Sequence, residues 1–160
     1  YVLTCTVSAT PAPTDVFWTR AGSGRVDTEN SGTTDQGLSK LSGGSVDSPS
    51  LVIRSVDRGD AGAYTCVARN SIGTGSSPTV TLTVTYRPTL TVSRTNILIE
   101  AGSSTLLSCA VSAVPAINSL YWTKDGVRLV PSQNPTKYNG GSESVPSLTI
   151  FNADVTSDPG

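Results

Sequence analysis

The chain has 160 residues, a net charge of −1 and charged residues at only 14% of its positions. This charge balance excludes a surface built to bind nucleic-acid phosphates, which requires clustered Lys and Arg, and no apolar run approaches the roughly 18–20 residues of a membrane-spanning helix. Serine and threonine make up more than a quarter of the chain, and Gly and Pro recur throughout, which is typical of many short strands separated by turns.

The first half of the chain alternates between apolar and polar residues in several short segments. Alternation predicts half-buried strands, because successive side chains of a strand point to opposite faces. The predicted strands cover 1–9, 15–20, 50–54, 62–70 and 79–85, and a polar, glycine-rich loop covers 21–37. Val16 and Trp18 face the core in the second of these strands, and Val80, Leu82 and Val84 do so in the last.

The stretch 60–66 joins a turn to one of these strands. Asp60 and Gly62 suit a tight turn, since the carboxylate accepts hydrogen bonds from backbone N–H groups and glycine readily adopts a positive φ. Tyr64 and Cys66 stand two positions apart, so both point to the same face of the strand. We expect an aromatic ring and a sulfur atom to enter one core from this strand.

The pattern of the first half repeats in the second. Cys5 precedes Trp18 by 13 residues, and Cys109 precedes Trp122 by the same distance. The other matching segments, in the same order, are 3–9 with 107–113, 43–44 with 140–141, 49–51 with 146–148, and 60–62 with 158–160. A repeat of about a hundred residues is too long for a solenoid unit and indicates tandem domains. We predict one domain over 1–86 and a second over 87–160, the second opening with strands at 88–92 and 96–102.

The order Cys5, Trp18, Asp60-x-Gly-x-Tyr-x-Cys66 resembles the immunoglobulin fold. Segment 66–73 is similar to the F–G hairpin of I-set domains, with Asn70 and Gly73 turning the chain, and residues 100–109 are similar to their A′–B turn. The resemblance implies an all-β fold of two tandem immunoglobulin-like β-sandwiches with Greek-key topology. It also implies that the first sandwich lacks strand A and that the second lacks strands F and G.

The resemblance further implies that Cys5 and Cys66 form a disulfide between the two sheets. Cys109 would be unpaired, because its partner would fall beyond residue 160. The aromatic residues expected at the centres of the two cores are Trp18, Tyr64 and Trp122. The alternative is a catalytic thiol, which would require a base, and the chain contains no histidine.

Two charged positions also recur in the repeat. Lys40 and Asp60 reappear as Lys137 and Asp158. We therefore expect a salt bridge at the end of each sandwich. In the first domain it would join the strand that precedes 50–54 to the turn that follows 50–54, and in the second domain it would join the equivalent two segments. The alternative is two solvated charges whose recurrence has no structural meaning.

One outward-facing aromatic residue recurs as well. Phe17 lies between two inward residues, and Tyr121 has the same place before Trp122. The residues expected to form a partner-binding face are Phe17, Thr65, Val67, Arg69, Thr81 and Tyr121. Aromatic and Arg side chains among small polar ones suit protein recognition. The alternative is that neighbouring side chains cover Phe17, with Arg69 stacked on it for packing alone.

These observations predict a non-enzymatic protein-binding module in cell adhesion or cell-surface recognition, with a homophilic or heterophilic protein partner. No cofactor, metal, nucleic acid, small-molecule substrate or membrane contact is expected within this segment, since it has no metal-ligand cluster, phosphate-binding loop or paired carboxylates. The cysteine pair and the low-charge, Ser/Thr-rich composition favour an extracellular location. The alternatives are spacer repeats of an extracellular matrix protein and the ectodomain of a receptor whose signalling domain lies outside this segment.

Overall fold

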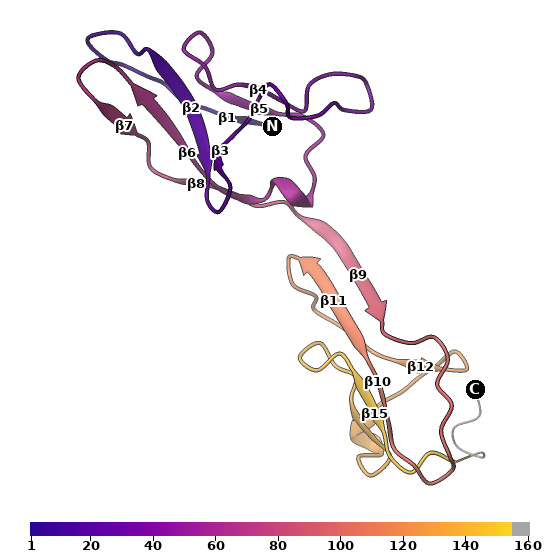
Figure 1. The fold of residues 1–160 in the computed structure, drawn as a ribbon. Coiled ribbons are helices and arrows are strands. Elements are labelled where there is room, and N and C mark those ends of the chain that lie inside the picture. The colour runs from indigo at the N-terminus through magenta and orange to yellow at the C-terminus, as the bar shows by residue number, and fades with distance from the viewer. Residues whose placement is uncertain (155–160) are drawn as a thin grey trace. The chain divides into compact units, whose positions relative to one another are not determined.

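The computed structural model describes residues 1–154, and the chain divides into two compact units, Tyr1–Val84 and Thr85–Gly160 (Figure 1). Over residues 1–154 both units consist of short antiparallel strands, with one 3-10 helix in each. No helix among the described residues is long and apolar enough to cross a membrane. The fold is all-β, as the alternating sequence predicts.

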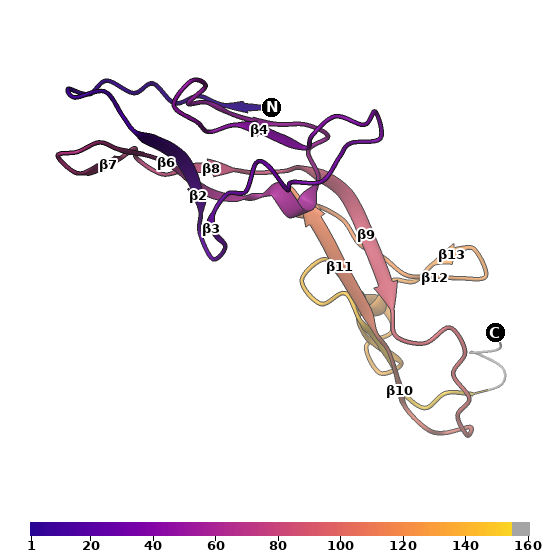
Figure 2. The same cartoon turned by 45° about the horizontal axis from the view of Figure 1, so that its top comes forward.

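Unit 1 consists of two sheets that enclose one core. Its elements are β1 (Val2–Leu3), β2 (Asp15–Arg20), β3 (Gly24–Arg25), β4 (Leu41–Gly43), β5 (Leu51–Ile53), the 3-10 helix η1 (Arg58–Asp60), β6 (Gly62–Arg69), β7 (Thr74–Ser76) and β8 (Val80–Leu82). One sheet has the order β1-β5-β4, and the other β3-β2-β6-β7 with β8 also paired to β6. Strands β2 and β6 lie side by side in both views (Figures 1 and 2). Both sheets supply the buried core residues, which are Leu3, Val16, Trp18, Leu51, Ile53, Tyr64, Cys66 and Leu82.

The two longest strands of unit 1 follow the alternation in the sequence. Strand β2 covers the predicted range 15–20, and β6 covers all but the last residue of 62–70. Trp18 lies opposite Cys66 in the antiparallel register, so the buried faces of the two strands coincide. Val16 and Trp18 are each only 1% exposed.

Two predicted strands are shorter in the structure. The strand predicted over 1–9 is reduced to β1, because its partner β5 has only three residues; past the end of that pairing the Cys5 N–H donates to the Ser50 hydroxyl at 3.1 Å. The strand predicted over 79–85 is reduced to β8, which pairs only with β6. Val80 lies opposite the buried Tyr64, so it points to the core side of the sheet as predicted, although it is 41% exposed.

Unit 2 contains three separate small sheets in its described residues. Its elements are β9 (Tyr86–Val92), β10 (Thr105–Leu107), β11 (Cys109–Val114), β12 (Thr123–Lys124), β13 (Val127–Arg128), the 3-10 helix η2 (Pro131–Gln133), β14 (Tyr138–Gly140) and β15 (Leu148–Ile150). The sheets are β10-β15-β14, β11-β9 and β12-β13. The predicted strand 88–92 lies within β9. The predicted strand 96–102 does not form, because none of the described strands pairs with it.

Each unit contains the same indole hydrogen bond, at positions that are equivalent in the sequence repeat. The indole Nε1–H of Trp18 donates to the Pro49 carbonyl at 2.8 Å, and that of Trp122 donates to the Pro146 carbonyl at the same distance. A buried or half-buried indole N–H requires such a partner. The repeat in the sequence is thus a repeat in three dimensions.

A pair of glycines forms the same turn in each unit. Gly43 and Gly140 have φ of +82° and +85°, in the left-handed region that favours glycine. A Cβ atom at either position would overlap the backbone carbonyl oxygen of Ser50 or Ser147, respectively. This close approach explains why the Gly-Gly dipeptide recurs in both copies of the sequence.

Candidate functional site

The centre of unit 1 is a cross-link between its two sheets. Cys5 and Cys66 form a disulfide with their Cα atoms 6.4 Å apart. Trp18 and Tyr64 are buried in the same core cluster. The Tyr64 hydroxyl donates to the Asp60 backbone carbonyl at 2.8 Å, and desolvation of the phenol raises the pKa of Tyr64. These contacts hold β2 and β6, whose outer faces carry the candidate binding residues, in a fixed register.

The corresponding residues of unit 2 are less enclosed. Trp122 is half-buried, and Cys109 is a free, half-buried cysteine among the described residues. Cys109 still occupies a position equivalent to that of Cys5, since its N–H donates to the Ser147 hydroxyl at 3.1 Å as the Cys5 N–H donates to the Ser50 hydroxyl. Unit 2 therefore repeats the local structure of unit 1 without its disulfide.

The expected charged pair at the end of unit 1 is present, but with a second acid. Lys40 Nζ lies 3.0 Å from Asp60 Oδ2 and also bonds to Asp57. The bond to Asp57 is the largest contribution that raises the pKa of Lys40, and the bond to Lys40 lowers the pKa of Asp57. Asp57 also accepts the Gly59 N–H at 2.7 Å and so caps η1.

Sequence reasoning missed Asp57, although a repeated spacing marks it. Lys137 Nζ lies 3.1 Å from Asp154 Oδ2, and Asp154 follows Lys137 by 17 residues, as Asp57 follows Lys40. The expected pairing of Lys137 with Asp158 lies outside the described residues. The recurring spacing of 17 is the signal that identifies these acids.

The Lys40–Asp57 pair should give unit 1 a defined pH dependence. The folded-state pKa of Asp57 lies below its ordinary value of 3.8, and the folded-state pKa of Lys40 lies above its ordinary value of 10.5. The stabilisation from Asp57 is therefore present above about pH 4 and lost as the pH falls through the folded pKa, whereas that from Lys40 is present below about pH 10.5 and lost as the pH rises further. In urea titrations, the destabilisation caused by Asp57→Asn should be constant near pH 7 and should shrink as the pH falls below about 4. A difference that stays unchanged at acidic pH would show that the Asp57 carboxylate does not stabilise the fold.

The outer face of the β2–β6 pair brings three of the predicted binding residues together. The register places Phe17 opposite Val67 and Thr19 opposite Thr65, and all four side chains are half-buried. Thr65 also shares a hydroxyl–hydroxyl hydrogen bond of 3.1 Å with Thr79. Phe17, Thr65 and Val67 therefore form a continuous strip across two strands.

The remaining predicted residues lie at the margins of this strip or in unit 2. Arg69 is exposed at the end of β6, where its Nε–H donates to the Thr74 hydroxyl at 3.2 Å. Thr81 is exposed on β8, opposite Ala63. Tyr121 belongs to unit 2 and is 54% exposed. We name the Phe17, Thr65, Val67, Arg69 and Thr81 surface the unit 1 face.

The guanidinium that stacks on Phe17 is Arg25 of β3, which the sequence reasoning did not identify. Arg25 Cζ lies 4.2 Å from the centroid of the Phe17 ring. Its two terminal nitrogens donate to the two oxygens of Asp15 at 2.9 and 3.0 Å, and this fork lowers the pKa of Asp15. Stacking of Arg69 on Phe17, considered above, is wrong, because β3 and not β6 brings a guanidinium over the ring.

Unit 2 contains the same stacked pair. Arg128 Cζ lies 4.7 Å from the centroid of the Tyr121 ring. The hairpins are equivalent, since β12–β13 pairs Thr123 with Arg128 as β2–β3 pairs Thr19 with Arg25. An arginine one or two residues after a turn glycine is not distinctive in sequence, so only the cross-strand register reveals the pair.

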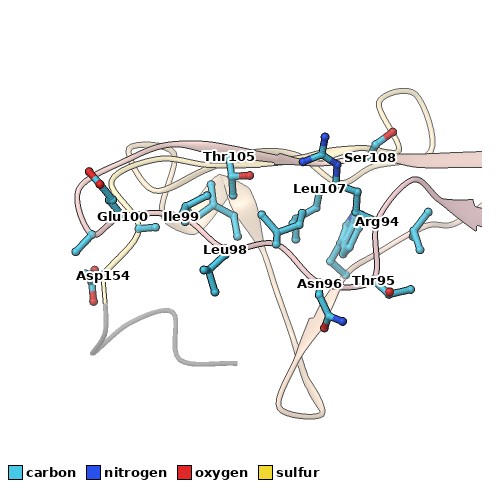
Figure 3. Close-up of a pocket in the computed structure, with 16 residues that line it drawn as sticks. Arg94, Thr95, Asn96, Leu98, Ile99, Glu100, Thr105, Leu107, Ser108 and Asp154 are labelled. Carbon is cyan, nitrogen blue, oxygen red and sulfur yellow. The ribbon is translucent and has the colours of Figure 1, made fainter.

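Unit 2 also contains an apolar cavity of about 1020 Å³ (Figure 3). It lies between the segment 92–101 and strand β10, with Trp122 and Ile150 among its lining residues. The lining includes Ser108, but the chain has no histidine to activate it. Among residues 1–154 no cluster of His, Cys, Asp or Glu has the arrangement of a metal site.

Comparison with known sequences agrees with this architecture. The sequence model of the family described as an immunoglobulin domain matches residues 1–70. Protein amalgam of Drosophila melanogaster is 31% identical over 95% of this chain and 41% of its own length. Cell adhesion molecule Dscam2 of the same organism is 28% identical over 97% of this chain and 7% of its own length. The chain thus spans less than half the length of these relatives.

Comparison with solved structures shows the same fold. The complex of Dpr2 Ig1-Ig2 with DIP-Theta Ig1-Ig3 contains a chain that aligns with a TM-score of 0.64 and 22% identity, over 98% of this chain and 50% of that one. At this identity the likeness concerns the fold alone. The matched domain sequence, the disulfide with its packed tryptophan and the antiparallel sheets lead to one conclusion. The chain belongs to the immunoglobulin superfamily.

Proposed function

We propose that the chain is an extracellular, non-enzymatic protein-binding module that acts in cell adhesion or cell-surface recognition, and that the unit 1 face contacts the partner. The observation that carries the proposal is the strip of Phe17, Thr65 and Val67 on the rigid β2–β6 pair. A half-buried aromatic ring with Arg25 stacked on it, and with Arg69 exposed at the end of β6, has the composition of protein interfaces. Relatives named for cell adhesion support the same role, and the disulfide suits an oxidising extracellular environment.

The proposal can be tested by changing the unit 1 face without changing its core. Beads coated with the full chain should aggregate with themselves or attach to cells that display the partner. The double variant Phe17→Ala and Arg69→Ser should fold, because neither side chain is in the buried core cluster, and should lose most of this attachment, since aromatic and Arg residues dominate interface energies.

A matched control lies on the opposite sheet. Val2 is an apolar residue of β1 that is 50% exposed, and Val2→Ala should leave both folding and attachment unchanged. Folding of each variant is checked by its circular dichroism spectrum and urea midpoint. Unchanged attachment of the correctly folded double variant would remove the unit 1 face from the proposal.

A further inference from the structure

The two stacked arginine–aromatic pairs differ in one respect. In unit 1 the N–H edge of Arg25 is occupied by the Asp15 carboxylate, at 2.9 and 3.0 Å. The residue of unit 2 equivalent to Asp15 is Ser119, three positions before Trp122 as Asp15 is three before Trp18. Among residues 1–154 no carboxylate forms an ion pair with Arg128. The Arg128 guanidinium is thus stacked on the Tyr121 ring, while no carboxylate of residues 1–154 is ion-paired with its N–H groups.

We infer that Arg128 and Tyr121 form a binding site for a carboxylate side chain, Asp or Glu, presented by a partner protein. The inference rests on the proposed protein-binding function and places a specific contact in unit 2. Unit 1 shows the same arrangement with its carboxylate bound, since Arg25 stacks on Phe17 and forms an ion pair with Asp15 at the same time. A guanidinium can do both because its flat face stacks on the ring while its edge presents parallel N–H donors.

The surroundings of Arg128 are suited to an external ligand. Arg128 and Tyr121 are both exposed, Tyr121 at 54% of its residue surface. Stacking on Tyr121 restrains the guanidinium before any ligand binds, so less side-chain freedom is lost on binding than for an unrestrained arginine. Arg128 lies on β13, which pairs with β12, and Tyr121 comes two residues before β12, so the hairpin keeps the guanidinium close to the ring.

The test uses the full chain and a small probe, N-acetyl-aspartate amide, with N-acetyl-asparagine amide as the uncharged comparison. The arginine Nε–Hε resonances are followed by NMR at constant ionic strength. The Arg128 resonance should shift in a saturable way with the aspartate probe only. The Arg25 resonance should not shift, because Asp15 already occupies its edge.

Two variants that exchange the residue types of positions 15 and 119 make the test specific. Ser119→Asp should supply an internal carboxylate and abolish the response of Arg128, whereas the matched Ser119→Asn should retain it. Asp15→Ser should make Arg25 responsive. An unresponsive Arg128 in the wild-type chain, or an equal response in Ser119→Asp, would overturn the inference. The titration needs no adhesion partner, so it gives its answer whether or not the coated beads aggregate, and the failure of one proposal is distinguishable from the failure of the other.

Discussion

Replacing Cys5 and Cys66 together with serine should lower the free energy of unfolding of unit 1 by about 4 kcal/mol. The disulfide joins residues 61 positions apart. Closing so long a loop removes many conformations from the unfolded chain, and the loss of that constraint is expected to amount to about a quarter or more of a small domain's stability. Urea titration followed by circular dichroism, with and without a reducing agent, measures the change.

The third cysteine provides the control for this experiment. Cys109 lies in unit 2 and is not disulfide-bonded, so Cys109→Ser should leave the unfolding of unit 1 unchanged. Reducing agent should destabilise the wild-type chain and the Cys109→Ser variant equally, and should have no effect on the double variant. If the double variant is as stable as the wild type, the packing around Trp18 alone holds the sheets together.

Trp18→Ala should destabilise unit 1 by about 3–5 kcal/mol. The indole is 1% exposed and is the largest fully buried side chain of the core. Its removal leaves a cavity between the sheets, and it also leaves the Pro49 carbonyl without the indole N–H that bonds to it at 2.8 Å. The change is measured from the urea dependence of the circular dichroism signal.

The neighbouring residue separates burial from position in the chain. Phe17 is on the same strand but on the outer face, and it is not part of the buried core cluster, so Phe17→Ala should cost much less than Trp18→Ala. Trp18→Phe keeps a buried ring but loses the hydrogen bond, and should fall between the two. Equal costs for Phe17→Ala and Trp18→Ala would mean that the two sheets do not pack as described.

The strands that alternate most clearly could be predicted from the sequence with their correct faces. Strands β2 and β6 are long, paired along their whole length and buried on one side, so the period of two determines both their extent and their orientation. The segment 1–9 alternates equally well but forms only β1, because the length of a strand depends on the length of its partner, and β5 has three residues. Alternation alone does not contain that information.

The side-chain partners could be predicted only in part, for a related reason. Alternation correctly indicates that Phe17 points away from the core, but it does not indicate which strand lies beside β2. Arg25 reaches the ring because β3 folds back on β2 through a short turn. In the same way Lys40 was expected to pair with Asp60, but not with Asp57, which comes close because η1 turns the backbone there. Contacts that depend on the geometry of a turn cannot be predicted from the alternation of the sequence and are found only in the structure.

The paired glycines at positions 43–44 and 140–141 have a consequence for how the chain can vary. Neither Gly43 nor Gly140 belongs to the apolar core, and both lie at the end of a short strand. Yet any side chain there would meet the backbone oxygen of the residue just before the next strand, in a conformation that other residues rarely adopt. Each unit therefore has a position outside its core where the backbone itself opposes every residue other than glycine, so exposure alone is a poor guide to which positions of this chain can be substituted.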